Sequence, residues 1–229
     1  MTAWDLPTRL FHWSLVALVA AAWISYRYAE ALGDVTLVWH RGIGLAILTL
    51  VVWRVLWGFA GSATSRFATF VRSPAAALAY ARDLIAGKSR HFLGHNPLGA
   101  WMILALLCVL ATDAGFGLFA VDDNDLTGGP LYRLVSEDAN KFATHWHEEI
   151  FDAVLLPLIA LHIAANVFYG RVKKEPLITA MVTGMKPAGA YEDAQCIGAA
   201  GRPMLRAALL LVLAAAIVLG AIFGLGGKF

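Results

Sequence analysis

The chain has 229 residues, of which 59% are apolar and 15% are charged, and its mean hydropathy is +0.66. This composition lies well outside that of a soluble globular domain and predicts a multi-span membrane protein. The formal net charge of +2 says little by itself, and no nucleic-acid partner is expected. The two cysteines, Cys108 and Cys196, form neither a CxxC pair nor a C-x-x-C-H motif, which excludes a disulfide framework and covalently attached haem.

Five segments reach the length of about 20 residues that a hydrocarbon core of about 30 Å requires. The strands of a β-barrel would instead show short alternating runs, so these segments are expected to be helices. The predicted fold class is an all-α integral membrane bundle, with a four-helix core in residues 1–187 and a linker and fifth helix in residues 188–229. The expected spans are residues 10–28, 37–59, 98–119, 150–169 and 204–225.

Positive charge is concentrated in two linkers, between the second and third spans and between the fourth and fifth, whereas the linker 120–146 is mostly acidic. By the positive-inside rule both basic linkers are cytoplasmic. The N-terminus is then expected in the cytoplasm and the C-terminus in the periplasm. The basic residues are Arg66, Arg72, Arg82, Lys88 and Arg90, then Arg171, Lys173, Lys174, Lys186 and Arg202, and the acidic ones are Asp122, Asp123, Asp125, Glu137 and Asp138.

The first span carries His12 near its start. Asp5 is a possible N-cap, and Pro7 lies in the first turn, where its missing N–H costs nothing. His12 is therefore expected at the cytoplasmic end of the helix. An alternative interpretation makes residues 1–22 a cleaved signal peptide, although the amino-terminal region is only weakly basic and His12 interrupts the apolar run.

The second span opens with VWHRGIG, which places His40 near the periplasmic surface. Gly44, one turn later, shares the face of His40 and leaves room for a flat group to approach the backbone. Arg54 is about 40° from His40 in azimuth and roughly 21 Å deeper. It is expected to face the same interior at the cytoplasmic level.

The first basic linker predicts a short helix on the membrane surface. Ser73 is its candidate N-cap, Pro74 its first residue and Gly87 its terminator. The third span then starts at GHNPLG and carries Asp113 toward its outer end, before an acidic periplasmic cap.

The fourth apolar stretch, residues 145–170, holds His147 and His162. On a regular α-helix their spacing leaves the two imidazoles about 60° apart in azimuth and roughly 22 Å apart along the axis. Ionisable groups in a membrane span are costly and indicate a functional site by default. His145 competes with His147, but it is about 100° out of phase with His162, so His147 is preferred.

Opposite helix directions match the histidines in depth as two pairs, His40 with His147 and His12 with His162. A planar metallomacrocycle suits such pairs best, because bis-imidazole ligation fills both axial positions. Zinc would usually need two further ligands at each site. No such ligands are obvious at the inner level, although Glu148, Glu149 and Asp152 offer carboxylates at the outer one.

Haem propionates need cationic or hydrogen-bonding partners. Arg9 and Arg54 are candidates at the inner site and Arg41 at the outer site. A lone histidine at a helix end is more often an interfacial or hydrogen-bonded residue than a ligand. The remaining histidines, His91, His95 and His145, are assigned to that class.

Several motifs occur in order along the chain: WDLPTRLFHW, HRGIG, WRVLWG, LGHNPLGAWM, HEE, LHIAANV and PLITAMVTGMKP. Together they resemble the bacterial di-haem cytochrome b family that includes the cytochrome b subunit of nickel-iron hydrogenases, over residues 1–187. The resemblance implies two non-covalent b haems in a four-helix core, with axial ligands at His12, His40, His147 and His162. The chain departs from that pattern in its fifth helix, where Gly220 and Gly224 form a small-xxx-small face that could dock another helix.

The leading functional hypothesis is an electron-transfer subunit of a respiratory chain in the bacterial inner membrane, in contact with lipid. Electrons would pass between the quinone pool, docked near the inner haem with His95 and Asn96 as contacts, and a periplasmic partner. The acidic linker could receive a basic c-type cytochrome or a dehydrogenase or hydrogenase subunit. Two alternatives are a self-contained quinone oxidoreductase acting on a small periplasmic reductant such as superoxide, and a non-redox membrane anchor or transporter.

Overall fold

The computed structural model describes residues 1–34, 37–88, 90–122, 127–194 and 202–228, which belong to two compact units. The first unit consists of Met1–Leu10, Val55–Leu106 and Leu158–Leu209, and the second of Phe11–Arg54, Leu107–Pro157 and Leu210–Phe229. Asp123, Asp125 and Cys196, as well as part of the predicted linker after residue 187, lie outside the described residues. The division into domains at residue 187 stays a prediction.

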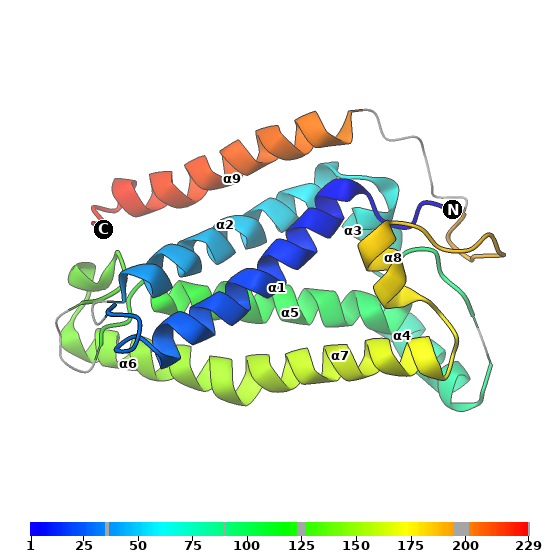
Figure 1. Cartoon of the computed structure of the whole chain (residues 1–229), viewed down its shortest axis with the longest axis horizontal. Helices are drawn as coiled ribbons and strands as arrows, with labels where there is room; N and C mark the ends of the chain where they lie inside the picture. The colour runs from blue at the N-terminus through cyan, green and yellow to red at the C-terminus, as the bar shows by residue number, and fades with distance from the viewer. Residues whose placement is uncertain (35–36, 89, 123–126, 195–201, 229) are drawn as a thin grey trace. The chain divides into compact units, whose positions relative to one another are not determined.

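The described residues are helical and include no β-strand, only two isolated bridges. Five helical segments are long and apolar enough to cross a membrane, so the predicted all-α membrane fold is confirmed. Figure 1 shows the helices from α1 in blue to α9 in red. They are α1 (Leu6–Arg27), α2 (Val38–Ala60), α3 (Phe67–Phe70), α4 (Pro74–Ile85), α5 (Pro97–Gly117), α6 (Glu137–Glu149), α7 (Leu156–Arg171), α8 (Leu177–Thr183) and α9 (Pro203–Gly224), with short η1 (Ala63–Ser65), η2 (Tyr132–Leu134) and η3 (Ile150–Leu155).

Side-chain caps fix the helix starts that the sequence predicts. The backbone N–H of Thr8 donates to Asp5 Oδ1 at 2.7 Å at the start of α1, and Ser73 Oγ accepts the N–H of Ala76 at the start of α4. Gly87 follows α4 with φ of +75°, a conformation that favours glycine at a helix end. Both predicted caps and the predicted terminator are confirmed.

The fourth span begins 13 residues earlier than predicted. Ser136 Oγ accepts the N–H of Ala139 at 3.3 Å, and Glu137 and Asp138 occupy the first turn of α6, where carboxylates favour the positive end of the helix. The helical segment runs from Glu137 to Arg171. The linker predicted over residues 120–146 is therefore helical in its second half, because α6 begins within it at Glu137.

The fourth span is also not a regular α-helix, since η3 is a π-helical segment. π-turns are rare and occur frequently at functional sites. This one lies between His147 and His162 in the sequence. The predicted azimuth of about 60° assumed a regular α-helical step of 100° per residue and does not apply across the π-turn.

The first unit has a core built from distant parts of the chain. Trp4, Leu93 and Ala180 are buried together. The backbone N–H groups of Ala3 and Trp4 both donate to the carbonyl oxygen of Gly184, at 2.8 and 3.1 Å. These contacts tie the segment before α1 to the end of α8.

Lys186, one of the basic residues of the linker after the fourth span, is buried at 4% exposure. Its Nζ donates to the carbonyl oxygen of Phe92 at 2.8 Å. Burial lowers the pKa of Lys186, and the neighbouring carboxylates Glu175 and Asp193 oppose this effect. Lys186 is therefore a structural residue of the first unit, rather than part of a solvated basic surface.

In the second unit α9 packs against α2. Val218 and Ile222 of α9 are buried with Leu131, and the partly buried side chains Leu45, Leu48 and Val52 of α2 pack against them. The small-xxx-small face plays no part in this contact, because a Cβ at Gly220 or Gly224 would meet no atom within 4 Å.

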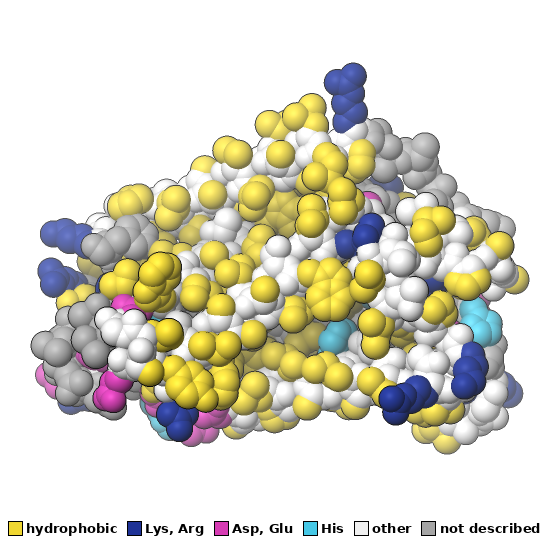
Figure 2. Space-filling model, in the orientation of Figure 1, with side chains coloured by type: hydrophobic (Ala, Val, Ile, Leu, Met, Phe, Trp, Pro, Cys, Tyr) yellow, Lys and Arg dark blue, Asp and Glu magenta, His cyan; other side chains and the backbone are white. Residues whose placement is uncertain are grey.

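Hydrophobic side chains remain exposed along the long helices (Figure 2). On α9, for example, Leu209, Val212 and Phe223 are each more than half exposed. In segments of this length and apolarity such surfaces contact lipid.

The loop after α5 is held by a close backbone approach at Gly129, whose N–H donates to the carbonyl oxygen of Ala120 at 2.8 Å. A Cβ at Gly129 would lie 2.1 Å from the carbonyl oxygen of Gly117. We expect Gly129→Ala to lower the free energy of unfolding by about 1–3 kcal/mol, measured by thermal unfolding in detergent. Gly115→Ala is the matched control, since a Cβ there meets no atom within 4 Å; equal melting temperatures for the two variants would contradict the expectation.

Candidate functional site

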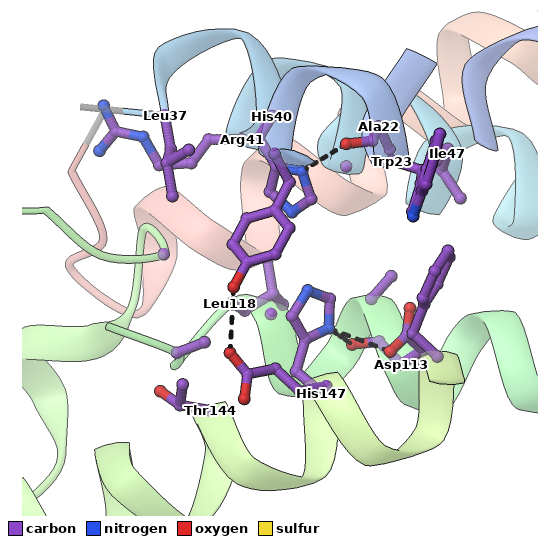
Figure 3. Close-up of a pocket in the computed structure, with 18 of the residues that line it drawn as sticks. Ala22, Trp23, Leu37, His40, Arg41, Ile47, Asp113, Leu118, Thr144 and His147 are labelled. Carbon is purple, nitrogen blue, oxygen red and sulfur yellow. Dashed lines mark hydrogen bonds and ion pairs between the residues drawn. The ribbon is translucent and has the colours of Figure 1, made fainter. Parts of the chain in front are cut away.

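A cavity of about 660 Å³ lies within the second unit, lined by residues of α1, α2, α5 and α6. Its size is within the range of about 300–1,000 Å³ that is usual for ligand and cofactor sites. Figure 3 shows the side chains of His40 and His147 entering it from different helices. Gly44 and Asp113 also line the cavity.

Asp34 starts the helix that carries His40. Its two carboxylate oxygens accept the backbone N–H groups of Val38 and Trp39 at 2.9 and 2.7 Å. A carboxylate at this end of a helix satisfies orphan N–H groups and favours the helix dipole. The first turn of α2, and with it the position of His40, is fixed in this way.

His40 and His147 face each other across the cavity, with ring centroids 6.0 Å apart and ring planes at 70° (Figure 3). His40 Nδ1 lies 2.9 Å from the carbonyl oxygen of Ala22, and His147 Nδ1 lies 3.0 Å from that of Asp113. A carbonyl oxygen can only accept a hydrogen bond, so each Nδ1 carries the proton and donates it. The lone pair of each Nε2 is then left for a metal.

The two imidazoles fit axial ligation of a planar metal macrocycle. Two metal–imidazole bonds of about 2 Å each span about 4 Å between nitrogens, which ring centroids 6.0 Å apart can accommodate. Gly44 adds the open space that a flat group requires, because a Cβ there would meet no atom within 4 Å. Gly117 lies behind the His147 ring, where a Cβ would come within 3.2 Å of Cε1.

Asp113 is a site residue that the sequence analysis placed but did not use. It is 8% exposed, and its Oδ1 lies 3.0 Å from His147 Nδ1. Nδ1 is thus equally close to the carbonyl oxygen and the carboxylate of the same residue (Figure 3). The sequence contained a sign of this role: Asp113 is the single acidic residue within α5, and ionisable residues in membrane spans indicate function.

Arg41 and Tyr26 lie at the edge of the cavity. An Arg41 guanidinium nitrogen donates to the carbonyl oxygen of Gly128 at 3.1 Å, which leaves other N–H groups of its five for a ligand. The Tyr26 ring lies 5.7 Å from that of His40, and its hydroxyl donates to Glu148 Oε1 at 3.3 Å. The cavity therefore has an apolar interior and a charged rim.

Three other histidines do not enter the cavity. His145 is exposed, whereas His147 is half-buried, which agrees with the preference for His147. His91 Nδ1 lies 3.0 Å from Glu175 Oε1. The His95 ring packs 4.5 Å from the Trp4 ring and 4.6 Å from the Phe70 ring.

The predicted inner-site residues are divided between the units. Arg9, in the first unit, donates to a backbone carbonyl of α8. His162, in the same unit, is half-buried on α7 beside Asn166, whose Nδ2 lies 3.4 Å from His162 Nε2. His12 and Arg54 belong to the second unit, where Arg54 is 3% exposed. The pairing of His12 with His162 stays a prediction from the sequence.

Asn96, a predicted quinone contact, caps α5: its Oδ1 accepts the N–H of Gly99 at 2.8 Å.

Within the described parts of the chain, no group of three or more His, Cys, Asp or Glu side chains is placed to hold a metal ion. The described residues therefore do not supply the two further ligands that a zinc site at the facing imidazoles would usually require.

Comparison with known proteins gives one match. The family model described as prokaryotic cytochrome b561, the family of nickel-iron hydrogenase cytochrome b, matches residues 3–184. This range contains all four predicted ligands and ends before α9. No curated protein and no solved structure matches the chain.

A substitution at Gly44 tests whether the cavity holds a flat cofactor. We expect Gly44→Val to lower the ratio of bound haem to protein, because the added side chain projects into the open space beside His40. The ratio is measured by absorbance of the purified protein. Gly42→Val, on the same helix but exposed and outside the cavity lining, is the control. Equal haem content in both variants would contradict the assignment.

Proposed function

The chain belongs to the prokaryotic cytochrome b561 family, and we propose that it carries electrons across the bilayer between the quinone pool and a periplasmic redox partner. Family membership together with five apolar helices makes it a multi-pass protein of the bacterial inner membrane that binds haem b and transfers electrons. The number of haems, their ligands and the partners are parts of the proposal.

The observation that carries the proposal is the His40–His147 couple. Both rings face the cavity, and both Nδ1 atoms are occupied by hydrogen bonds. These hydrogen bonds hold each ring in one orientation and one tautomer, so that both Nε2 atoms can ligate a single iron. When bound, haem b supplies an iron that accepts and releases one electron.

Other residues of the cavity suit the same cofactor. Leu45, Ile47 and Leu110 line it with apolar surface, which excludes water and tunes the potential of a buried iron. Arg41 lies at its rim with N–H groups that suit the carboxylate of a haem propionate. A haem held by both His40 and His147 would transfer electrons and would have no free position for oxygen.

We propose a second haem ligated by His12 and His162, with Arg9 and Arg54 as propionate partners. This part rests on the depths of the four histidines in the sequence. The basic linkers are proposed to lie in the cytoplasm, and quinone to dock near the second haem. His95 and Asn96 stay proposed quinone contacts.

The periplasmic partner is proposed to carry a basic surface. Asp122, Glu137 and Asp138 lie in or directly after the linker that is expected in the periplasm. Opposite charges steer a partner into contact and raise its association rate. A c-type cytochrome or a dehydrogenase or hydrogenase subunit would meet this requirement.

Removing either ligand of the first couple tests the proposal. We expect His40→Ala and His147→Ala each to remove one of two haems, because a single imidazole leaves one axial position unfilled. Haem is quantified against protein, and the reduced-minus-oxidised spectrum reports the remaining haem. His145→Ala should retain both haems, since His145 is exposed. Wild-type protein without a reducible bis-histidine haem spectrum would overturn the proposal.

The second couple gives a separate prediction. We expect His12→Ala and His162→Ala each to remove the other haem, and the double variant with His40→Ala and His12→Ala to bind none. The measurement is a redox titration, in which a different transition should vanish for each couple. His91→Ala is the control, since His91 pairs with Glu175. Retention of both haems without His12 or His162 would refute the second site.

A further inference from the structure

The two histidines of the cavity differ in what holds their Nδ1–H groups. His40 donates to a carbonyl oxygen, that of Ala22 at 2.9 Å. His147 donates toward Asp113, with the carbonyl oxygen and the carboxylate Oδ1 both at 3.0 Å. One of the two proposed ligands therefore has a charged partner and the other a neutral one.

The Asp113 carboxylate is placed where a charge is costly. Its side chain is 11% exposed and lies on a helix apolar enough to span a membrane. Burying a carboxylate there is costly. Among the described residues Oδ1 accepts no hydrogen bond of its own, and it lies 3.0 Å from His147 Nδ1, which donates its proton to the carbonyl oxygen of the same aspartate. Gly117, one turn after Asp113, allows the ring to pack closely, because a Cβ there would lie 3.2 Å from His147 Cε1 and the ring would have to shift.

We propose that Asp113 is a positioning residue that lowers the reduction potential of the haem held by His40 and His147. This inference rests on the function proposed above. A carboxylate next to Nδ1–H draws that proton toward itself, which makes Nε2 a stronger donor to iron. Stronger donation and a nearby negative charge both favour the ferric state over the ferrous state, so the one-electron reduction becomes less favourable.

The test is a redox titration of Asp113→Asn, which keeps the size of the side chain and removes its charge. We expect the equilibrium constant for reduction of one haem to rise at least tenfold, a shift of about 59 mV for one electron. The electron paramagnetic resonance g-values of the same ferric haem should change, because they report the donor strength of its axial ligands. The other haem should keep its potential.

Asp152→Asn is the matched control. Asp152 also lines the cavity but is exposed, so its replacement should shift the equilibrium constant less than twofold, about 18 mV. Haem-bound Asp113→Asn protein whose potential moves no more than that of the control would overturn the inference. Protein that binds no haem even as wild type would instead overturn the proposed function.

A second variant covers the case in which Asp113→Asn loses the haem. Asp113→Glu keeps the carboxylate. Retention of the haem by Asp113→Glu, with an equilibrium constant for reduction that differs from wild type by less than the tenfold expected for Asp113→Asn, supports the inference. Loss of the haem in both variants overturns it, because the size of residue 113, and not its charge, would then control the site.

Discussion

The hydrocarbon core of a membrane offers no water, so every ionisable side chain on a membrane-spanning helix must find its partner within the protein or in a bound group. For His40 and His147, protein atoms satisfy only one of the two ring nitrogens. Each gives its Nδ1–H to an oxygen and turns the rest of its ring toward a cavity. The cavity, the open space beside Gly44 and the charged rim all suit the flat cofactor that we propose between these two rings.

Helix irregularities place this couple. The carboxylate of Asp34 starts α2 shortly before His40, and Ser136 starts α6 long before the apolar stretch of the fourth span begins. The π-turn η3 begins three residues after His147. A π-turn widens the helix and displaces the residues that follow it. The helix that carries His147 is therefore irregular after this residue and begins with a capped polar turn before it.

Much of this arrangement could be predicted from the sequence, because it depends on quantities that a single helix fixes. The limits of the first, second, third and fifth spans follow from apolar length. The relative depth expected for His40 and His147 follows from the rise per residue and the order of the helices. Gly44 could be placed beside His40 because one turn separates them. The caps at Asp5 and Ser73 depend on contacts within three residues of each cap.

What escaped prediction depends on how separate elements face one another. The contact of Asp113 with His147 requires the rotation of α5 relative to α6, which no spacing within either helix determines. The burial of Lys186 could not be predicted, because its partner, the carbonyl oxygen of Phe92, is 94 residues away. The helix at residues 137–149 was not predicted, because its composition is polar and only the capping residue Ser136 marks its start.

The docking of α9 on α2 restricts the routes by which molecules dissolved in the bilayer can reach α2, the helix that carries His40. Val218 and Ile222 cover the side of α2 that bears Leu45, Leu48 and Val52. A lipid-soluble molecule or a second membrane subunit cannot touch α2 along that side without displacing α9. The fifth helix therefore blocks this side of α2, and lipid-soluble molecules can approach α2 only from its other sides.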